Sequence, residues 1–139
     1  MRKFEFRLQR ILDYRVLQED WAKTAFLEAQ ASRVQAEREL EVLVGKKQEV
    51  ASQSRQSLVE MKDLETWTLR IEDEIEAQLS MIRILEDEEK KQQQEWIEAK
   101  QALESMEKLR LIAKEEYDKT INSEEQKELD EWANRKKAA

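Results

Sequence analysis

The sequence of 139 residues has no proline and a single glycine, Gly45. Proline and glycine interrupt helices and form tight turns, whereas the Ala, Leu, Glu, Gln, Lys and Arg that dominate this chain are strong helix formers. The sequence therefore predicts an all-α protein built from very long helices. One helix of this length would extend about 200 Å and would not stay folded alone, so it must pair with another helix.

The composition excludes most kinds of chemistry. Charged residues make up 41% of the chain and aromatic residues 6%, so apolar side chains are too dilute to fill a globular core. The net charge of −7 disfavours nucleic-acid binding, which needs clustered Lys and Arg. Without histidine or cysteine there is no ordinary catalytic triad, thiol nucleophile or zinc site. We expect no catalytic residue, no cofactor, no bound metal and no small-molecule substrate.

The expected location follows from the same sequence. No apolar run approaches the ~20 residues that a membrane-spanning helix needs. Met1 is typical of a natural start, and no signal peptide is expected to precede the first helix. The sequence therefore predicts a cytoplasmic protein.

A break near the middle of the sequence favours a hairpin. The polar segment 52–57 has no large apolar residue, and Ser57 with Glu60 fits a capping box that opens a second helix. The alternative is that these serines only lie on the exposed face of one continuous helix. We predict a single coiled-coil domain over residues 1–139, an antiparallel two-helix hairpin, with these extents: helix one at about 4–51, turn at about 52–57, helix two at about 58–121.

A 3-4 spacing predicts the two faces that pack together. On the first helix the spacing selects Phe4, Leu8, Ile11, Arg15, Gln18, Ala22, Ala25, Ala29, Ser32, Ala36, Glu39, Leu43, Lys46 and Val50. On the second it selects Met61, Leu64, Thr68, Ile71, Ile75, Gln78, Ile82, Leu85, Trp96, Ala99, Leu103 and Met106. Folding about residue 55 places small residues opposite large ones. The pairs so predicted are Ala36 with Ile75, Ala29 with Ile82, Ala25 with Leu85, and Arg15 with Trp96.

Both ends of the chain carry features that the hairpin does not explain. Apolar residues continue from Leu109 to Ile121 beyond the reach of the first helix, and a further start signal at Asn122 or Ser123 predicts a short helix at about 124–136. This C-terminal overhang indicates a protein partner, a self-association face or a frayed tail. The first turns are basic, which fits a membrane-surface anchor, a dock for an acidic protein or an ordinary helix start.

Several segments resemble the FliJ family of flagellar export proteins, in matching order over nearly the whole chain. The segments are Phe4-x-Phe6-x-Leu8-x-x-Ile11-Leu12-x-x-Arg15, Gln35-Ala36-Glu37-x-x-Leu40-x-x-Leu43, Ser57–Met61, and Glu125–Ala133. The resemblance implies a cytoplasmic, monomeric component of the flagellar type III export apparatus, peripherally associated with the cytoplasmic face of the inner membrane. It implies partners too: the export ATPase hexamer, whose assembly and activity it promotes, the cytoplasmic linker of the export gate, and export chaperones.

The resemblance also implies two sets of binding residues. The export-gate set lies near the hairpin turn and corresponds to Glu39, Leu43, Lys46, Val50, Trp67, Ile71, Glu74 and Gln78. The ATPase-ring set lies near the two termini and corresponds to Arg7, Arg10, Leu129, Asp130, Glu131 and Trp132. The alternatives are an injectisome stalk protein, a structural coiled-coil dimer or scaffold without an ATPase partner, and a membrane-surface adaptor.

Overall fold

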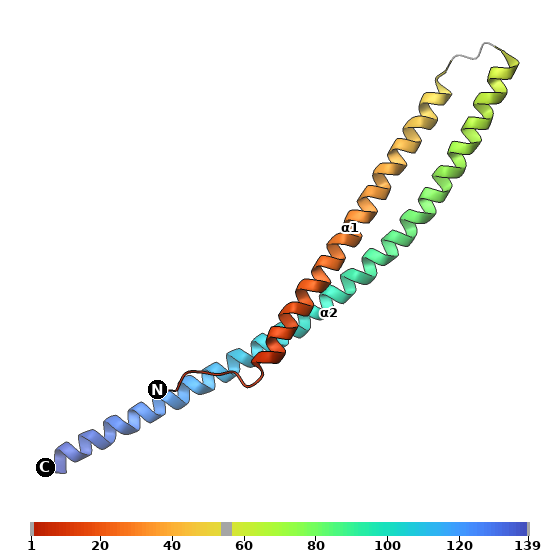
Figure 1. Cartoon of the computed structure of the whole chain (residues 1–139). Helices are drawn as coiled ribbons and strands as arrows, with labels where there is room; N and C mark the ends of the chain where they lie inside the picture. Colours follow the sequence, from red (N-terminus) through yellow and green to blue (C-terminus); the bar gives the residue numbers. More distant parts are fainter. Residues whose placement is uncertain (1, 54–56, 139) are drawn as a thin grey trace. The chain divides into compact units, whose positions relative to one another are not determined.

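The computed structural model describes residues 2–53 and 57–138. Within these ranges it has two helices, α1 (Gln9–Ala51) and α2 (Leu58–Ala138), and no strand (Figure 1). Two long helices packed against each other confirm the predicted all-α fold class. Contacts group the chain into two compact units: a hairpin unit, Trp21–Ile97, and a terminal unit, Met1–Asp20 with Glu98–Ala139.

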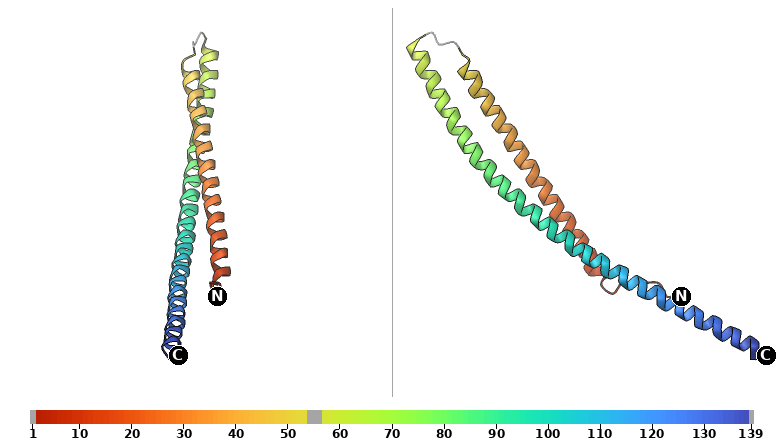
Figure 2. Two further views of the ribbon diagram at one scale, coloured as in Figure 1. Left: turned by 90° about the vertical axis from the view of Figure 1, so that its left-hand side faces the viewer. Right: turned by 180° about the vertical axis from the view of Figure 1, so that it is seen from behind.

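The hairpin unit is held together by one narrow seam. Its parts of α1 and α2 run antiparallel and side by side (Figures 1 and 2). The most buried residues are Ala36, Ile71 and Ile82, with exposed fractions of 4%, 5% and 7%. A helix pair shields only one stripe of each partner, so most of both surfaces stays in water. Stability therefore depends on a few seam residues.

The stripe predicted on the second helix is confirmed in the hairpin unit. Leu64, Thr68, Ile71, Ile75, Gln78, Ile82 and Leu85 are partly or fully buried. Met61 is the exception, at 44% exposed. Figures 1 and 2 show the first turn of α2 extending past the last turn of α1, so Met61 has no facing helix to shield it.

The stripe predicted on the first helix is wrong at four of its fourteen positions. Ala22, Ala29, Ala36, Leu43 and Val50 are partly or fully buried as predicted, and so are Gln18 and Ala25. Ile11, Ser32, Glu39 and Lys46 are exposed, and the next residues, Leu12, Arg33, Leu40 and Lys47, are partly buried in their place. The prediction followed the 3-4 spacing strictly and so chose the neighbouring residue at each of these positions. Arg33 and Lys47 fit there because their long side chains reach carboxylates of α2, on Glu89 and Glu72.

The predicted pairing of the two helices is also wrong, by one to three helical turns. Trp96 stacks on Phe26, with ring centroids 5.4 Å apart and planes 24° apart, where Arg15 was the predicted partner. Gln78 Nε2 donates to the carbonyl of Ala36 at 2.9 Å, where Ile75 was the predicted partner. Volume matching omitted the aromatic stack and the cross-seam ion pairs, and these favour a different register. The hairpin is not symmetric about residue 55.

The register can be tested with cysteine pairs, because the sequence contains no cysteine. We expect Phe26→Cys with Trp96→Cys to cross-link readily with a short bifunctional thiol reagent, because the parent rings are in contact. Phe26→Cys with Leu85→Cys is the matched control. Leu85 lies eleven residues from Trp96, or about 16 Å along a helix, so it is out of reach. Preferential cross-linking of the control pair would contradict the register.

The two helices end and begin on either side of the predicted turn. α1 ends at Ala51 and α2 begins at Leu58, while residues 54–56 of the predicted turn lie outside the described residues. The Glu60 amide donates to Ser57 Oγ at 3.1 Å, which is the helix cap that the sequence predicts. The Met61 amide donates to the Ser57 carbonyl at 3.0 Å, the first backbone bond of the new helix.

Gly45 lies in the interior of α1 and has no steric need to be glycine. A Cβ atom added there would have nothing within 4 Å, and Gly45 does not have a positive φ. We expect Gly45→Ala to stabilise the chain by about 1 kcal/mol, because alanine loses less backbone entropy in a helix. Urea unfolding measures the change. Ala31→Gly, at an exposed position of the same helix, is the control and should lower the free energy of unfolding by a similar amount. A less stable Gly45→Ala variant would contradict the conclusion that Gly45 has no steric need to be glycine.

In the terminal unit the helix limits differ from those predicted. α1 begins at Gln9 and not near residue 4, and α2 continues to Ala138 without a break at Asn122 or Ser123. The side chains of Asn122 and Ser123 are exposed, so they lie on the outside of a continuous helix and lower its propensity only slightly. Strong helix formers on both sides keep α2 intact.

Candidate protein-binding surfaces

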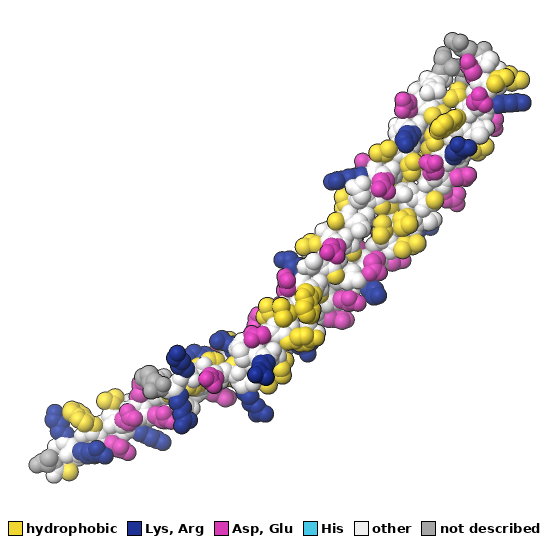
Figure 3. Space-filling view, viewed as in Figure 1, with side chains coloured by type: hydrophobic (Ala, Val, Ile, Leu, Met, Phe, Trp, Pro, Cys, Tyr) yellow, Lys and Arg dark blue, Asp and Glu magenta, His cyan; other side chains and the backbone are white. Residues whose placement is uncertain are grey.

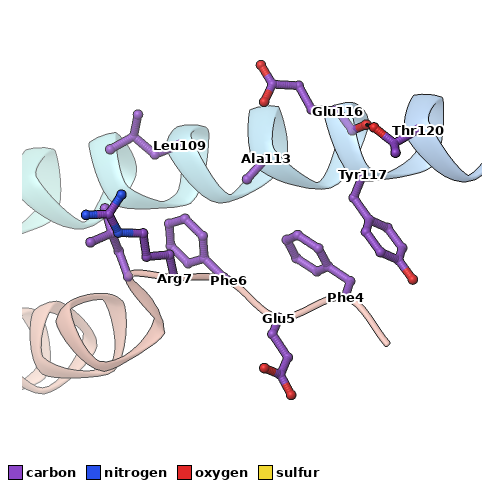
Figure 4. Close-up of a pocket in the computed structure, with 10 residues that line it drawn as sticks. Phe4, Glu5, Phe6, Arg7, Leu109, Ala113, Glu116, Tyr117 and Thr120 are labelled. Carbon is purple, nitrogen blue, oxygen red and sulfur yellow. Dashed lines mark hydrogen bonds between the residues drawn. The ribbon is translucent and has the colours of Figure 1, made fainter. Parts of the chain in front are cut away.

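The N-terminal segment 2–8, here called the strap, is not helical and lies against α2 in the terminal unit (Figures 1 and 4). Phe4, Phe6 and Leu8 are partly buried, whereas the alternate residues Glu5 and Arg7 are exposed. In Figure 4 the Glu5 side chain points away from α2. Residues 2–6 of the strap thus have the two-residue periodicity of an extended chain, and residues 7–8 form the turn into α1.

This periodicity matches that of the helix beneath the strap. Alternate residues of an extended chain lie about 6.6 Å apart, and helix residues four apart lie about 6 Å apart. The stripe Leu109, Ala113 and Tyr117 therefore meets the alternating apolar side chains of the strap. This alternation is visible in the sequence, because Phe4, Phe6 and Leu8 alternate with charged residues. The helical interpretation of these residues missed it.

The Phe4 ring has the most specific contacts of the strap. Its centroid lies 5.5 Å from that of Tyr117, with the planes tilted by 52°. The guanidinium of Arg110 and the ammonium of Lys114 lie 5.5 and 5.3 Å from the Phe4 ring centroid. Two cations and one aromatic ring thus surround the ring, an arrangement in which the cations are attracted to its π-electrons.

The strap only partly fills the surface that it covers. An open groove of about 440 Å³ remains between the strap and α2, and its α2 side, here called the strap groove, consists of Leu109, Ala113, Glu116, Tyr117 and Thr120 (Figure 4). Among the described residues, no hydrogen bond joins the strap to α2. The Gln9 amide instead donates to the Phe6 carbonyl at 3.0 Å and closes the turn into α1. Few buried contacts and no hydrogen bonds are typical of a segment that opens easily.

Beyond the strap groove, α2 is bare. Every described residue from 122 to 138 is exposed, including Leu129 at 61% and Trp132 at 62%. Lys136 Nζ lies 4.7 Å from the Trp132 ring centroid. The predicted apolar overhang of α2 therefore has two parts, one covered and one exposed. The strap covers part of it at Leu109, Ala113 and Tyr117, and nothing in the described chain covers it after residue 121.

The residues predicted to bind the ATPase ring fall into separate groups within the terminal unit. Leu129, Asp130, Glu131 and Trp132 share one exposed turn of α2, and Arg7 lies in the strap beside Leu109. Leu109 and Leu129 are twenty residues apart, or about 30 Å along a helix, so Arg7 is not part of the exposed turn. Arg10 is exposed in the first turn of α1.

The residues predicted to bind the export gate lie in the hairpin unit, and they differ in exposure. Glu39, Lys46, Trp67 and Glu74 are exposed, Leu43, Val50 and Gln78 are partly buried, and Ile71 is fully buried. Trp67 is 57% exposed, with the Arg70 guanidinium 5.9 Å from its ring centroid. Ile71 and Gln78 are engaged in the seam, so the accessible part of this set centres on Trp67.

One further apolar group near the turn was not predicted. Leu58 and Val59, in the first turn of α2, are 70% and 69% exposed. Leu58 also lines a shallow groove with Met61 and Leu69. The available signal was their position directly after the Ser57 cap, where a helix that starts beyond its partner leaves apolar residues uncovered.

The charged side chains of this protein have structural roles. Figure 3 shows acidic, basic and hydrophobic side chains interspersed on the visible face. The Arg33 guanidinium donates to Glu89 and to Glu37, and these hydrogen bonds raise the pKa of Arg33 above its usual value. Within residues 2–53 and 57–138, no three acidic side chains are placed to hold a metal ion. In the same ranges, neither helix contains an apolar stretch of the length that a bilayer span requires.

Comparison with known proteins identifies a family. The family model described as flagellar FliJ protein matches residues 4–138, nearly the whole chain. No curated protein matches the chain, and no solved structure does. The match includes residues 4–8 of the strap, the hairpin and the bare end of α2.

Proposed function

The chain belongs to the FliJ family, which makes it a component of the flagellar export apparatus, and we propose that it is the stalk-like protein of that apparatus. It binds the ring of the export ATPase hexamer, promotes the assembly and activity of that ring, and connects it to the cytoplasmic linker of the export gate. It also handles export chaperones. Its place is the cytoplasm, against the inner membrane through the apparatus.

The observation that carries this proposal is the bare end of α2. A helix normally buries one face, but every described residue of α2 after Ile121 is exposed. Leu129 and Trp132 lie three residues apart on one face of this segment, and both are more than half exposed. Tryptophan in such a position is typical of the few residues that dominate a protein interface.

A second observation supports a linking role. The accessible residues of the predicted gate set, centred on Trp67, lie in the hairpin unit, and the bare end of α2 lies in the terminal unit. Two separate surfaces allow two partners to bind at the same time. A stalk that contacts the subunits of a ring unequally favours different states in different subunits, and this changes the ATPase rate without any catalytic group of its own.

The ATPase rate of the cognate export enzyme tests the proposal. We expect the full-length chain to raise this rate at near-stoichiometric amounts and to co-elute with the assembled ring. The same assay with the Ile82→Glu variant, whose seam is broken, controls for effects of unfolded chain. No stimulation together with no co-elution would overturn the proposal and leave a coiled-coil scaffold.

A further inference from the structure

The strap groove is a binding site that the stalk function does not require. We propose that it binds an extended segment of a partner protein with apolar or aromatic side chains at alternate positions, and that the strap occupies it in competition with that segment. The inference is independent of the ATPase assignment, because it rests on the groove and on the way the strap lies in it.

The groove selects an extended occupant. Leu109, Ala113 and Tyr117 form a stripe four residues apart, and alternate residues of an extended chain meet such a stripe almost in step. A second helix would contact α2 over a wider face. The strap shows the fit directly, because the Phe4 and Phe6 rings face α2 while Glu5 points away (Figure 4).

The groove also selects an aromatic ring at one position. The Phe4 ring lies between Arg110, Lys114 and Tyr117, at centroid distances of 5.5, 5.3 and 5.5 Å. An aliphatic side chain there would keep the apolar contact and lose the attraction of both cations. The occupant therefore needs an aromatic residue where the strap has Phe4.

Charge indicates what should precede that aromatic residue. Arg2 lines a neighbouring hollow of α2 together with Glu124, Glu125 and Glu128. The three acidic residues that line this hollow with Arg2 favour a basic residue two positions before the aromatic ring. The predicted partner segment therefore reads basic-x-aromatic-x-apolar, the pattern of Arg2, Phe4 and Phe6.

The strap can leave the strap groove without much loss of contact. Its backbone has no hydrogen bond to α2 among the described contacts, its apolar residues are only partly buried, and the groove beside it is open to solvent. A partner segment with better-filling side chains can replace it without breaking a helix. Because the strap is tethered, its high effective concentration sets the affinity that a partner must exceed.

A labelled peptide with the sequence of residues 2–9 serves as the probe, with binding followed by fluorescence anisotropy. The acceptor is the full-length chain with Phe4→Ala and Phe6→Ala, which releases its own strap and leaves both helices unchanged. We expect this acceptor to bind the peptide and the wild-type chain to bind it at least about tenfold more weakly. Adding Tyr117→Ala to the acceptor should abolish binding, whereas adding Trp132→Ala should leave it unchanged.

Three outcomes would overturn the proposal. Equal binding by the wild-type chain and the released acceptor would place the peptide outside the strap groove. No binding by an acceptor whose circular dichroism is fully helical would mean that the groove does not take an extended segment in trans. A wild-type dimer that is lost with Phe4→Ala and Phe6→Ala would make the occupant the strap of a second copy, not a different protein.

Discussion

Ile82→Glu is expected to unfold the hairpin unit. Ile82 is 7% exposed and lies in the single seam between α1 and α2. The substitution removes apolar contacts and places a carboxylate at a buried position of the seam. The two effects together should cost about 3–5 kcal/mol, a large part of the stability of a small domain. Helicity at 222 nm, followed by urea unfolding, measures the loss.

Ile84→Glu is the matched control for this prediction. Ile84 has the same side chain, lies two residues away on the same helix and is 63% exposed. A surface substitution of this kind should change stability by no more than about 0.5 kcal/mol. Equal effects of the two variants, whether both large or both small, would contradict the burial of Ile82 in the seam between α1 and α2.

Helix loss in Ile82→Glu should extend beyond the substituted turn. Long helices are stabilised mainly by packing, not by their intrinsic propensity. Once the seam opens, α1 has lost its partner over the hairpin unit, and so has the facing part of α2. We therefore expect one cooperative loss of helicity over this unit and not local fraying around residue 82.

The helices and the cap could be predicted because they depend on local signals. The lack of breakers predicts long helices, the spacing of apolar residues predicts the α2 stripe, and Ser57 with Glu60 predicts the start of α2. Each of these signals lies within a few residues of the feature it specifies. The all-α fold class therefore follows from the amino-acid sequence alone.

The register and the strap could not be predicted in the same way, because they depend on contacts between distant residues. Phe26 with Trp96 and Arg33 with Glu89 decide the register, and volume matching gave neither pair. For the strap, residues 4–8 fit both a helical and an extended spacing over so short a stretch. Only the apolar stripe from Leu109 to Tyr117, a hundred residues away, selects the extended one.

The candidate site was predictable in part for the same reason. Exposure of Leu129 and Trp132 follows from the missing partner helix, which the sequence shows. The burial of Ile71 and the seam bond of Gln78 depend on the register, and so the predicted gate set contained both of these engaged residues.

Leu129→Ala combined with Trp132→Ala is expected to remove most of the ATPase activation. If both residues are central contacts of the ring interface, their loss should weaken binding by roughly 30-fold or more. Both side chains are exposed and alanine is the best helix former, so helicity and unfolding should not fall. Activity is measured as the ATPase rate against the concentration of added chain, which separates weaker binding from a lower maximum.

Trp67→Ala distinguishes loss of the ring contact from loss of any exposed tryptophan. Trp67 is 57% exposed against 62% for Trp132, and it lies in the hairpin unit. We expect Trp67→Ala to activate the ATPase as the wild-type chain does and to bind the export-gate linker more weakly, which a pull-down with that linker would measure. The opposite pattern, with activation lost in Trp67→Ala and kept in the double variant, would exchange the partners of the two surfaces. Full activation by both variants would place the ring contact outside the bare end of α2 and would leave the basic strap and the first turn of α1 as the regions to test.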